Sequence, residues 1–379
     1  MTGDRPIYLD NNGTTPVADD VLAAMLPYLR DEYGNASSTT DLGRRAKAAI
    51  DKAREQVAAL IDADPADIVF TSGGTEASNH AIHGFAEIAP PARRKIVTSV
   101  VEHPATENAC KRLERGGYSV VRLPVNRDGV VDLSVAAREI DDTTALVTII
   151  HAQNEIGTLE PVGELAALAS KFRIPVHADA SQSLGKVPVS VRQWRVDALT
   201  IAGHKLYAPK GIGALYLRRV LNVPNLFDGA GQEQGRRPGT ENVAYIAGLG
   251  EACAIAAKRL ADDSKRLEAL RERLWTRLSA AVPDLIRVAA GAATLPNTLN
   301  VLFPDAVGND ILARLPDVFA STGSACHAGD SKPSSIILAL GYAPDVALGA
   351  VRLTSGRSTT EAQIDAAADK LAAAWKSLR

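Results

Sequence analysis

The chain of 379 residues carries 42 Lys and Arg against 44 Asp and Glu, a formal net charge of −2 at pH 7. Because nucleic-acid and membrane-surface partners require a basic excess, this balance argues against both. A hydrophobic fraction of 46%, with no apolar run long enough to span a bilayer, indicates a globular protein large enough for two domains. The first residues lack a charged-then-apolar leader, so we expect a cytoplasmic protein.

In the first two thirds of the chain, short β-branched apolar segments alternate with alanine-rich segments of helical period. Strands are predicted over Asp67–Thr71, Lys95–Val101, Ser119–Leu123, Ala145–His151, Ile174–Ala178, Asp197–Ala202 and Gly213–Leu217. Helices are predicted over Thr75–Glu87, Thr106–Arg115, Leu133–Ile140 and Val162–Phe172. This alternation predicts an α/β fold with a mainly parallel seven-stranded sheet, covered by helices on both faces. Ligands of such sheets bind outside the carboxyl ends of the strands.

The remainder of the chain has a different pattern. Residues Asn225–Thr240 are rich in Gly, Pro, Gln and Arg and indicate an ordered functional loop or a boundary. A long helix is predicted from Glu241 to Ala281. It is followed by a strand at Asn297–Leu302, helices at Asn309–Leu315 and Pro333–Leu340, a strand at Val351–Ser355 and a final helix opened by Thr360. We therefore expect a large domain over residues 16–257 and a smaller α+β domain formed by residues 1–15 and 258–379.

Lys205 is the most informative residue of the chain. It follows His204 where an apolar run opens into a glycine- and proline-rich turn. Partial burial at a strand end lowers the pKa of a lysine and makes its amine a nucleophile. Asp179 ends another apolar run. Alone it would be interpreted as a turn aspartate, but together with Lys205 it is interpreted as the partner of a cofactor's ring nitrogen. A Schiff-base lysine with an aspartate for a pyridinium nitrogen is the combination that pyridoxal phosphate requires.

A glycine-rich turn, Thr71–Glu76, joins a predicted strand to a predicted helix. Its glycines allow an anion to approach the backbone N–H groups at the helix start, although such turns are also common without a ligand. No metal site is expected, because His80 and His83 provide only two ligands on one helix face. The three cysteines, Cys110, Cys253 and Cys326, are too widely spaced to indicate a disulfide framework.

These motifs resemble the cysteine desulfurases, a family of fold-type I pyridoxal-phosphate enzymes, and are closest to the branch that includes selenocysteine lyases. The resemblance extends from Tyr8–Pro16 to Gly356–Thr360. It implies the fold-type I transferase fold and pyridoxal 5′-phosphate as the cofactor. It also implies a catalytic set of Lys205, Cys326 and His103.

The resemblance assigns a cofactor-binding role to several polar residues at the predicted strand ends. The implied set is Gly74, Thr75, His103, Asn154, Asp179, Gln182, His204, Lys205 and Thr240. In it, Gln182 donates to the phenolate oxygen and His103 stacks on the ring and moves protons. A backbone-bonded histidine and a turn asparagine are the ordinary alternatives for His103 and Asn154.

Two positions near this set carry further implications. Desulfurases commonly have a serine at position 202 that binds the phosphate, whereas this chain has Ala202, as selenocysteine lyases also have an apolar residue there. One phosphate hydrogen bond is therefore expected to be missing or replaced by water. The loop Arg237–Asn242 resembles one that crosses a dimer interface and brings Thr240 to the partner's phosphate, which implies a homodimer.

Cys326 lies between small residues and glycines, where an exposed free thiol is unusual unless it reacts. The resemblance makes it the nucleophile that takes sulfur from the substrate. Arg352 lies in an apolar strand and needs an anion if buried. An internal salt bridge is one interpretation, and the resemblance implies a carboxylate clamp, with Asn154 and Asn35 as further substrate contacts.

The expected function is pyridoxal-phosphate-dependent removal of sulfur from L-cysteine, which gives L-alanine and a persulfide on Cys326. The persulfide would pass to a sulfur-acceptor protein or thiol. Selenocysteine lyase activity on L-selenocysteine is the alternative, since the sequence does not separate the two substrates. An aminotransferase on the same fold would have no need of Cys326, and a non-catalytic sulfur-delivery partner would tolerate loss of Lys205.

Overall fold

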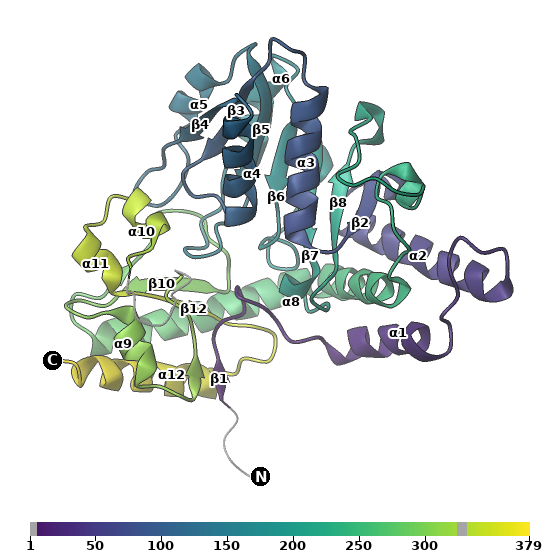
Figure 1. The fold of residues 1–379 in the computed structure, drawn as a ribbon. Helices are drawn as coiled ribbons and strands as arrows, with labels where there is room; N and C mark the ends of the chain where they lie inside the picture. Colours follow the sequence, from purple (N-terminus) through teal and green to yellow (C-terminus); the bar gives the residue numbers. More distant parts are fainter. Residues whose placement is uncertain (1–5, 324–331) are drawn as a thin grey trace.

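The computed structural model describes residues 6–323 and 332–379 (Figure 1). Its helices are α1 Asp19–Arg30, α2 Asp41–Leu60, α3 Gly74–Ile88, α4 Pro104–Arg115, α5 Leu133–Glu139, α6 Val162–Ser170, α7 Val191–Trp194, α8 Val243–Ala281, α9 Gly308–Ala313, α10 Ser335–Ala339, α11 Pro344–Leu348 and α12 Glu361–Lys376. Its strands are β1 Ile7–Tyr8, β2 Ile68–Thr71, β3 Lys95–Ser99, β4 Ser119–Leu123, β5 Thr144–Ile150, β6 Val176–Asp179, β7 Ala198–Ala202, β8 Gly213–Leu217, β9 Ile286–Arg287, β10 Thr298–Leu302, β11 Val318–Phe319 and β12 Ala350–Thr354.

The large sheet has seven strands in the order β2-β8-β7-β6-β5-β3-β4. Strand β8 runs antiparallel to both of its neighbours, and the other pairs are parallel. Every residue of β5 is buried, as expected for a strand covered on both faces. The predicted α/β class with a mainly parallel seven-stranded sheet is therefore confirmed.

Helices cover both faces of this sheet (Figure 1). On one face, Phe85 of α3 and Cys110 of α4 pack against strand residues such as Leu146. On the other face, residues of α2, α6 and the first part of α8 pack against strand residues that include Val147. These two layers of apolar side chains fix the strand ends, and with them the loops that carry polar groups.

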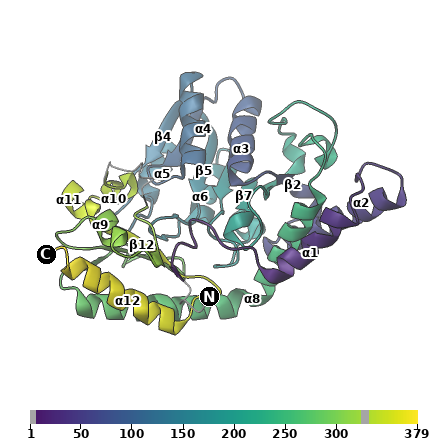
Figure 2. The same cartoon turned by 60° about the horizontal axis from the view of Figure 1, so that its bottom comes forward.

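A second, smaller core lies beside the large sheet. Strands β12-β10-β9 form an antiparallel sheet, and the short strands β1 and β11 form a parallel pair. Leu274 of α8, Phe303 and Trp375 of α12 belong to this core. Helix α8 runs along both cores, with α1 and α2 beside its first part and α12 beside its last part (Figures 1 and 2).

Helices α1 and α2, and the short helices α7 and α11, were not predicted from the sequence. The buried face of α2 consists largely of small residues such as Gly43, Ala46 and Ala53, so its apolar period is weak. Strand β6 begins at Val176 rather than at Ile174. Pro175 has no N–H for the ladder, and Arg173 has a left-handed backbone with φ 55°, so the chain becomes extended only after them.

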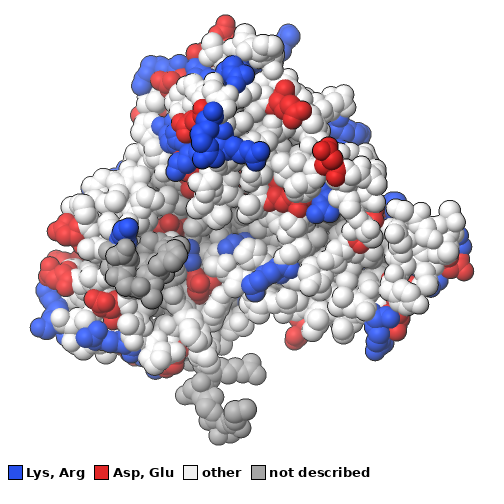
Figure 3. Space-filling view, in the orientation of Figure 1, with Lys and Arg blue, Asp and Glu red and all other residues white. Residues whose placement is uncertain are grey.

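No helix in the described part of the chain combines the length and apolarity that a membrane crossing needs. On the face shown in Figure 3, acidic and basic side chains are interspersed among uncharged ones. This mixture agrees with the formal net charge of −2.

Candidate active site

A cavity of about 240 Å³ opens at the carboxyl ends of β5, β6 and β7, between the two cores. It is lined by Asn12, Gly13, Gly74, Thr75, His103, Ala105, Ile150, Asn154, Asp179, Ser181, Gln182, Ala202, His204, Lys205 and Arg352. Every predicted cofactor ligand except Thr240 therefore lines this one cavity. The predicted substrate ligands Asn154 and Arg352 line it as well.

Lys205 reaches the cavity from a short 3₁₀ turn, Gly203–Lys205, that directly follows β7. Its Nζ donates to the backbone oxygens of Asn12 and of Gly13, the latter at 2.6 Å. Burial, and secondarily the positive charge of Arg352, lower the pKa of Lys205 to about 8. An amine with such a pKa is unprotonated in a useful fraction near neutral pH, which suits a Schiff-base nucleophile.

Asp179 ends β6 and is buried beside the cavity. Its Oδ1 accepts the backbone N–H of Ser181 at 2.9 Å, which holds the carboxylate at the strand end. Gln182 follows in the same turn, and its Nε2 donates to the backbone oxygen of Asn12 at 2.9 Å. A carboxylate and an amide donor thus face one cavity with the nucleophilic amine.

The start of α3 forms a cradle for an anion on another wall. Gly73 has φ +153°, a conformation that L residues rarely adopt, and it presents the first backbone N–H groups of the helix. A Cβ atom added at Gly74 would lie 3.1 Å from the Ser181 Oγ and 3.2 Å from the Ala202 Cβ. The hydroxyl of Ser181 and the methyl group of Ala202 therefore both lie close to the start of α3.

His204 lies beside this cradle. Its Nδ1 is 3.1 Å from the Thr14 hydroxyl, and burial together with the charge of Lys205 lowers its pKa to about 4. The ring is therefore neutral near pH 7. The free N–H groups at the start of α3, the Ser181 hydroxyl and the His204 imidazole fit a phosphate. Asp179 fits a pyridinium ring, and Lys205 fits an aldehyde. Together these residues fit pyridoxal phosphate.

His103 caps α4, where its Nδ1 accepts the backbone N–H of Ala105 at 3.1 Å. The ordinary interpretation, a histidine bonded to backbone, is thus realised, and the ring still lines the cavity. Burial lowers the pKa of His103, while the charge of Asp179 opposes that effect. A neutral imidazole that lines the cavity can accept a proton.

Arg352 lies on β12 and is buried. Its Nη2 forms an ion pair with Asp10 Oδ1 at 2.6 Å, and its Nη1 donates to the backbone oxygen of Asn154 at 3.2 Å. The internal salt bridge expected as one interpretation is therefore present. The Nε–H of Arg352 is buried without a partner among the described residues. A carboxylate in the cavity would satisfy this donor.

Three predicted site residues are not placed in this cavity. Asn35 is exposed, and its Oδ1 accepts the backbone N–H of Ser37 at 2.8 Å. Thr240 lines a separate cavity next to Ser72, on a loop fastened by the buried Arg54–Glu233 ion pair at 2.7 Å. Cys326 lies outside the described residues.

Several polar residues at the site were not predicted. Asp10, Asn12 and Ser181 contribute an ion-pair partner, a carbonyl oxygen for Lys205 and a hydroxyl. Lys186 lies behind Gln182. The only sequence signals were the polar run Asp10–Asn12 and a lysine four residues after Gln182 in a turn that follows a strand.

Within residues 6–323 and 332–379, no three His, Cys, Asp or Glu side chains cluster as a metal site would require. His80 Nε2 is instead 3.0 Å from the backbone oxygen of Pro224. Burial raises the pKa values of Cys110 and Cys253 to about 12, as expected for packed, unreactive thiols.

Comparisons with known proteins agree with this geometry. The family model described as Aminotransferase class-V matches residues 7–367. The cysteine desulfurase of Nostoc sp. is 45% identical over 361 residues, which cover 95% of this chain and 90% of the relative. The Mus musculus cysteine desulfurase is 40% identical over 378 residues, 99% of this chain and 82% of the relative. A solved NifS-like protein has 34% identity and a TM-score of 0.91, covering 97% of this chain and 98% of its own.

The chain therefore belongs to the aminotransferase class-V family and, within it, to the cysteine desulfurases. It is an enzyme that depends on pyridoxal 5′-phosphate, and the predicted fold-type I architecture is confirmed. A further solved relative is described as SspA in complex with cysteine; it has 33% identity and a TM-score of 0.82 and covers 92% of this chain and 98% of its own.

Proposed function

We propose that this chain removes sulfur from L-cysteine, releases L-alanine and collects the sulfur as a persulfide on Cys326. One observation carries the proposal: Lys205, Asp179 and the anion cradle at Gly74 converge on one cavity, in a chain 45% identical to a cysteine desulfurase. The free buried N–H of Arg352 supports an amino-acid substrate, because its carboxylate would complete that donor.

When bound, pyridoxal phosphate supplies an electron-accepting ring that stabilises negative charge at the substrate's α-carbon. In our proposal Lys205 carries this cofactor, and Asp179 keeps a proton on its ring nitrogen. Gln182 donates to the phenolate oxygen. Gly74, Thr75 and His204 hold the phosphate, with Ser181 as an added hydroxyl. Asn154 contacts the ring.

The remaining residues act on the substrate. Arg352 binds its carboxylate, assisted by Asn154, and the neutral His103 or the Lys205 amine takes the α-proton. The Cys326 thiolate then bonds to the substrate's sulfur. The Cβ–S bond breaks with its electron pair left on carbon. Cβ takes up a proton, and the α-carbon takes a proton back, to give alanine. The contact from Asn35 stays a prediction.

The proposed assembly is a homodimer. Thr240 lies away from the cavity of its own chain, which supports a role at the phosphate of a second copy. We further propose the division into residues 16–257 and residues 1–15 plus 258–379, since α8 contributes residues up to Ala256 to one core and from Leu270 to the other. A sulfur-acceptor protein or thiol and a cytoplasmic location stay predictions.

The variant Cys326→Ala tests the proposed sulfur transfer. It retains Lys205, Asp179 and Arg352, so we expect it to bind cofactor normally and to lose alanine release from L-cysteine by about 10³-fold or more. Alanine is measured with L-cysteine and, separately, with L-selenocysteine. Equal loss on both substrates supports a general desulfurase, and selective survival of the selenocysteine reaction favours the lyase. Full activity on L-cysteine would contradict the persulfide step.

A further inference from the structure

Lys186 is a buried lysine for which the proposed reaction has no assigned role. Lys186 is 7% exposed, and no acidic side chain among the described residues pairs with it. Its Nζ donates to Gln182 Oε1 at 2.9 Å and to Asn12 Oδ1 at 3.3 Å. A lysine held only by two amide oxygens is costly to bury, so its retention needs a reason.

The backbone directs this side chain inward. Gly185 has φ +70°, and a Cβ atom there would lie 2.5 Å from Leu206 Cδ1, so the turn requires glycine. The backbone oxygen of Lys186 accepts the Ser264 hydroxyl of α8. Lys186 is therefore fixed between the turn after β6 and helix α8, directly behind the cavity wall.

The chemistry of the ammonium group determines how both amides are oriented. Burial, and secondarily the charges of Lys205 and Arg352, lower the pKa of Lys186 to about 7, so the ammonium is the form that prevails below that pH. In this form the group has donors and no acceptor, so it selects the oxygen end of each amide. Gln182 must then direct its Nε2 away from Lys186, and one N–H of that nitrogen goes to the backbone oxygen of Asn12. Nε2 carries a second N–H, and Gln182 lines the cavity.

Asn12 is oriented in the same way. Its Oδ1 accepts from Lys186 and, at 3.1 Å, from Asn297 Nδ2, while its own Nδ2 donates to Thr298 Oγ1 at 2.9 Å. The backbone oxygen of Asn12 accepts from Lys205. Lys186 thus stabilises both the amide at the cavity and the residue that holds the nucleophilic amine.

We propose that Lys186 is a positioning residue that fixes the Gln182 amide with its nitrogen toward the phenolate oxygen of pyridoxal phosphate. The inference rests on the proposed function, because it presumes that the cofactor ring lies against Gln182. Without Lys186 only the bond from Gln182 Nε2 to the Asn12 backbone oxygen opposes rotation of the amide by half a turn, which would present the amide oxygen and repel the phenolate. Lys186 itself does not touch the cofactor.

The test is a double-mutant cycle on the holoenzyme with Lys186→Met, Gln182→Met and the double variant. The readout is the pH midpoint at which the visible absorption of the bound cofactor changes, together with the cofactor dissociation constant. Loss of a donor to the phenolate raises the midpoint, by about one pH unit for a charge-assisted hydrogen bond. We expect both single variants to raise it, and the double variant to match Gln182→Met alone.

The cycle separates positioning from a simple charge effect. Loss of a positive charge near Lys205 and Arg352 would also raise the midpoint, but it would add to the effect of Gln182→Met. Additive shifts, or an unchanged midpoint in Lys186→Met, would overturn the proposal. Lys95→Met is the matched control: its side chain is 14% exposed and pairs with Asp141 at 2.7 Å, away from the cavity, so the midpoint should not move.

A folding defect in Lys186→Met would still leave a decisive pair. The double variant replaces Lys186 and Gln182 together, so neither polar partner is left without the other. Its midpoint can therefore be compared with that of Gln182→Met. Equal midpoints support the proposal, and a further shift in the double variant overturns it. Failure of the proposed function would appear differently, because the wild-type protein would then release no alanine from L-cysteine, whatever the midpoints of the variants.

Discussion

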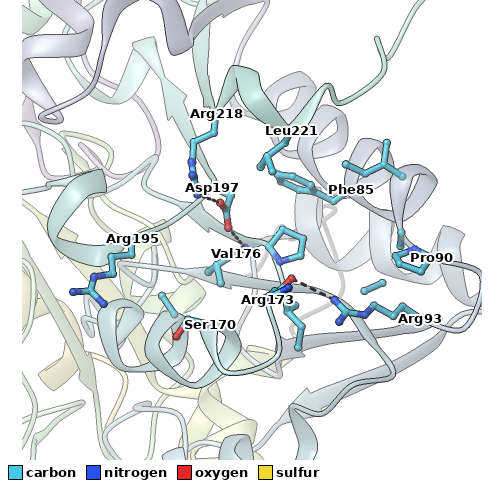
Figure 4. A pocket seen from close by; sticks show the side chains of 16 residues that line it. Phe85, Pro90, Arg93, Ser170, Arg173, Val176, Arg195, Asp197, Arg218 and Leu221 are labelled. Atoms are coloured by element: carbon cyan, nitrogen blue, oxygen red, sulfur yellow. Dashed lines mark hydrogen bonds and ion pairs between the residues drawn. The ribbon is translucent and has the colours of Figure 1, made fainter.

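Two cavities lie at opposite ends of the large sheet, and the larger one is not where the chemical groups converge. The cavity in Figure 4 has a volume of about 570 Å³ and lies at the amino ends of β5 and β6, with Ala145 and Val176 in its wall. The cavity with Lys205 has about 240 Å³ and lies at the carboxyl ends. Size alone would have selected the wrong end of the sheet.

The polar groups of the larger cavity fasten the fold. Asp197 accepts from Arg218 at 2.6 Å and from the backbone N–H of Val176 at 3.0 Å (Figure 4). Arg93 donates to the backbone oxygens of Phe172 at 2.8 Å and Arg173 at 3.3 Å. These bonds tie strand starts to neighbouring loops. At the smaller cavity, by contrast, burial displaces the pKa values of Lys205 and His204 and leaves an N–H of Arg352 unpaired, so those groups are available to a ligand.

The largest expected difference between the two cavities is in the kinetic effect of replacing one arginine from each. Arg352→Lys should raise KM for L-cysteine about 30–100-fold with a smaller change in kcat, because a lysine cannot form the two-pronged contact with a carboxylate. The control is Arg195→Lys at the larger cavity, which should leave both constants within about twofold. Steady-state kinetics of alanine formation measure both. An equal effect of the two substitutions would remove the distinction between the cavities.

The lowered pKa of Lys205 predicts how fast the apoprotein captures pyridoxal phosphate. Only the unprotonated amine attacks, so the capture rate should rise about tenfold per pH unit below pH 8 and level off above it. Stopped-flow absorbance between pH 6 and pH 9.5 follows the reaction. A rate that keeps rising to the top of this range would indicate an ordinary lysine, with a pKa of 10.5.

The sequence allowed the central part of the fold, and the convergence of Asp179 and Lys205, to be predicted for a physical reason. Parallel strands end at the same edge, so polar residues such as Asp179 and Lys205 that follow buried strands must meet. The contacts that Arg352 and Lys186 make across the chain, to Asp10 and Asn12, could not be predicted. They join segments far apart in sequence, and local patterns carry no information on such pairs. Helix α2 was missed because small residues form much of its buried face.

The smallest effect concerns the hydroxyl near the phosphate. Because Ser181 Oγ and Ala202 both lie close to Gly74 at the start of α3, Ala202→Ser should change cofactor affinity little, whereas Ser181→Ala should weaken it about 2–10-fold, equivalent to about 0.5–1.5 kcal/mol. The double exchange should restore it. Equilibrium titration of the apoprotein with pyridoxal phosphate measures all three. Tighter binding in Ala202→Ser, with no loss in Ser181→Ala, would show that the Ala202 position indeed lacks a hydrogen bond.

The most direct test of the central claim is to locate the cofactor on the chain. Borohydride reduction of the holoenzyme fixes pyridoxal phosphate permanently to the amine that carries it, and peptide mass spectrometry identifies that residue. We predict a single modified site at Lys205, in the smaller cavity at the carboxyl ends of the strands. Modification of Lys186 or of a surface lysine instead, or a protein that takes up no cofactor, would contradict the account.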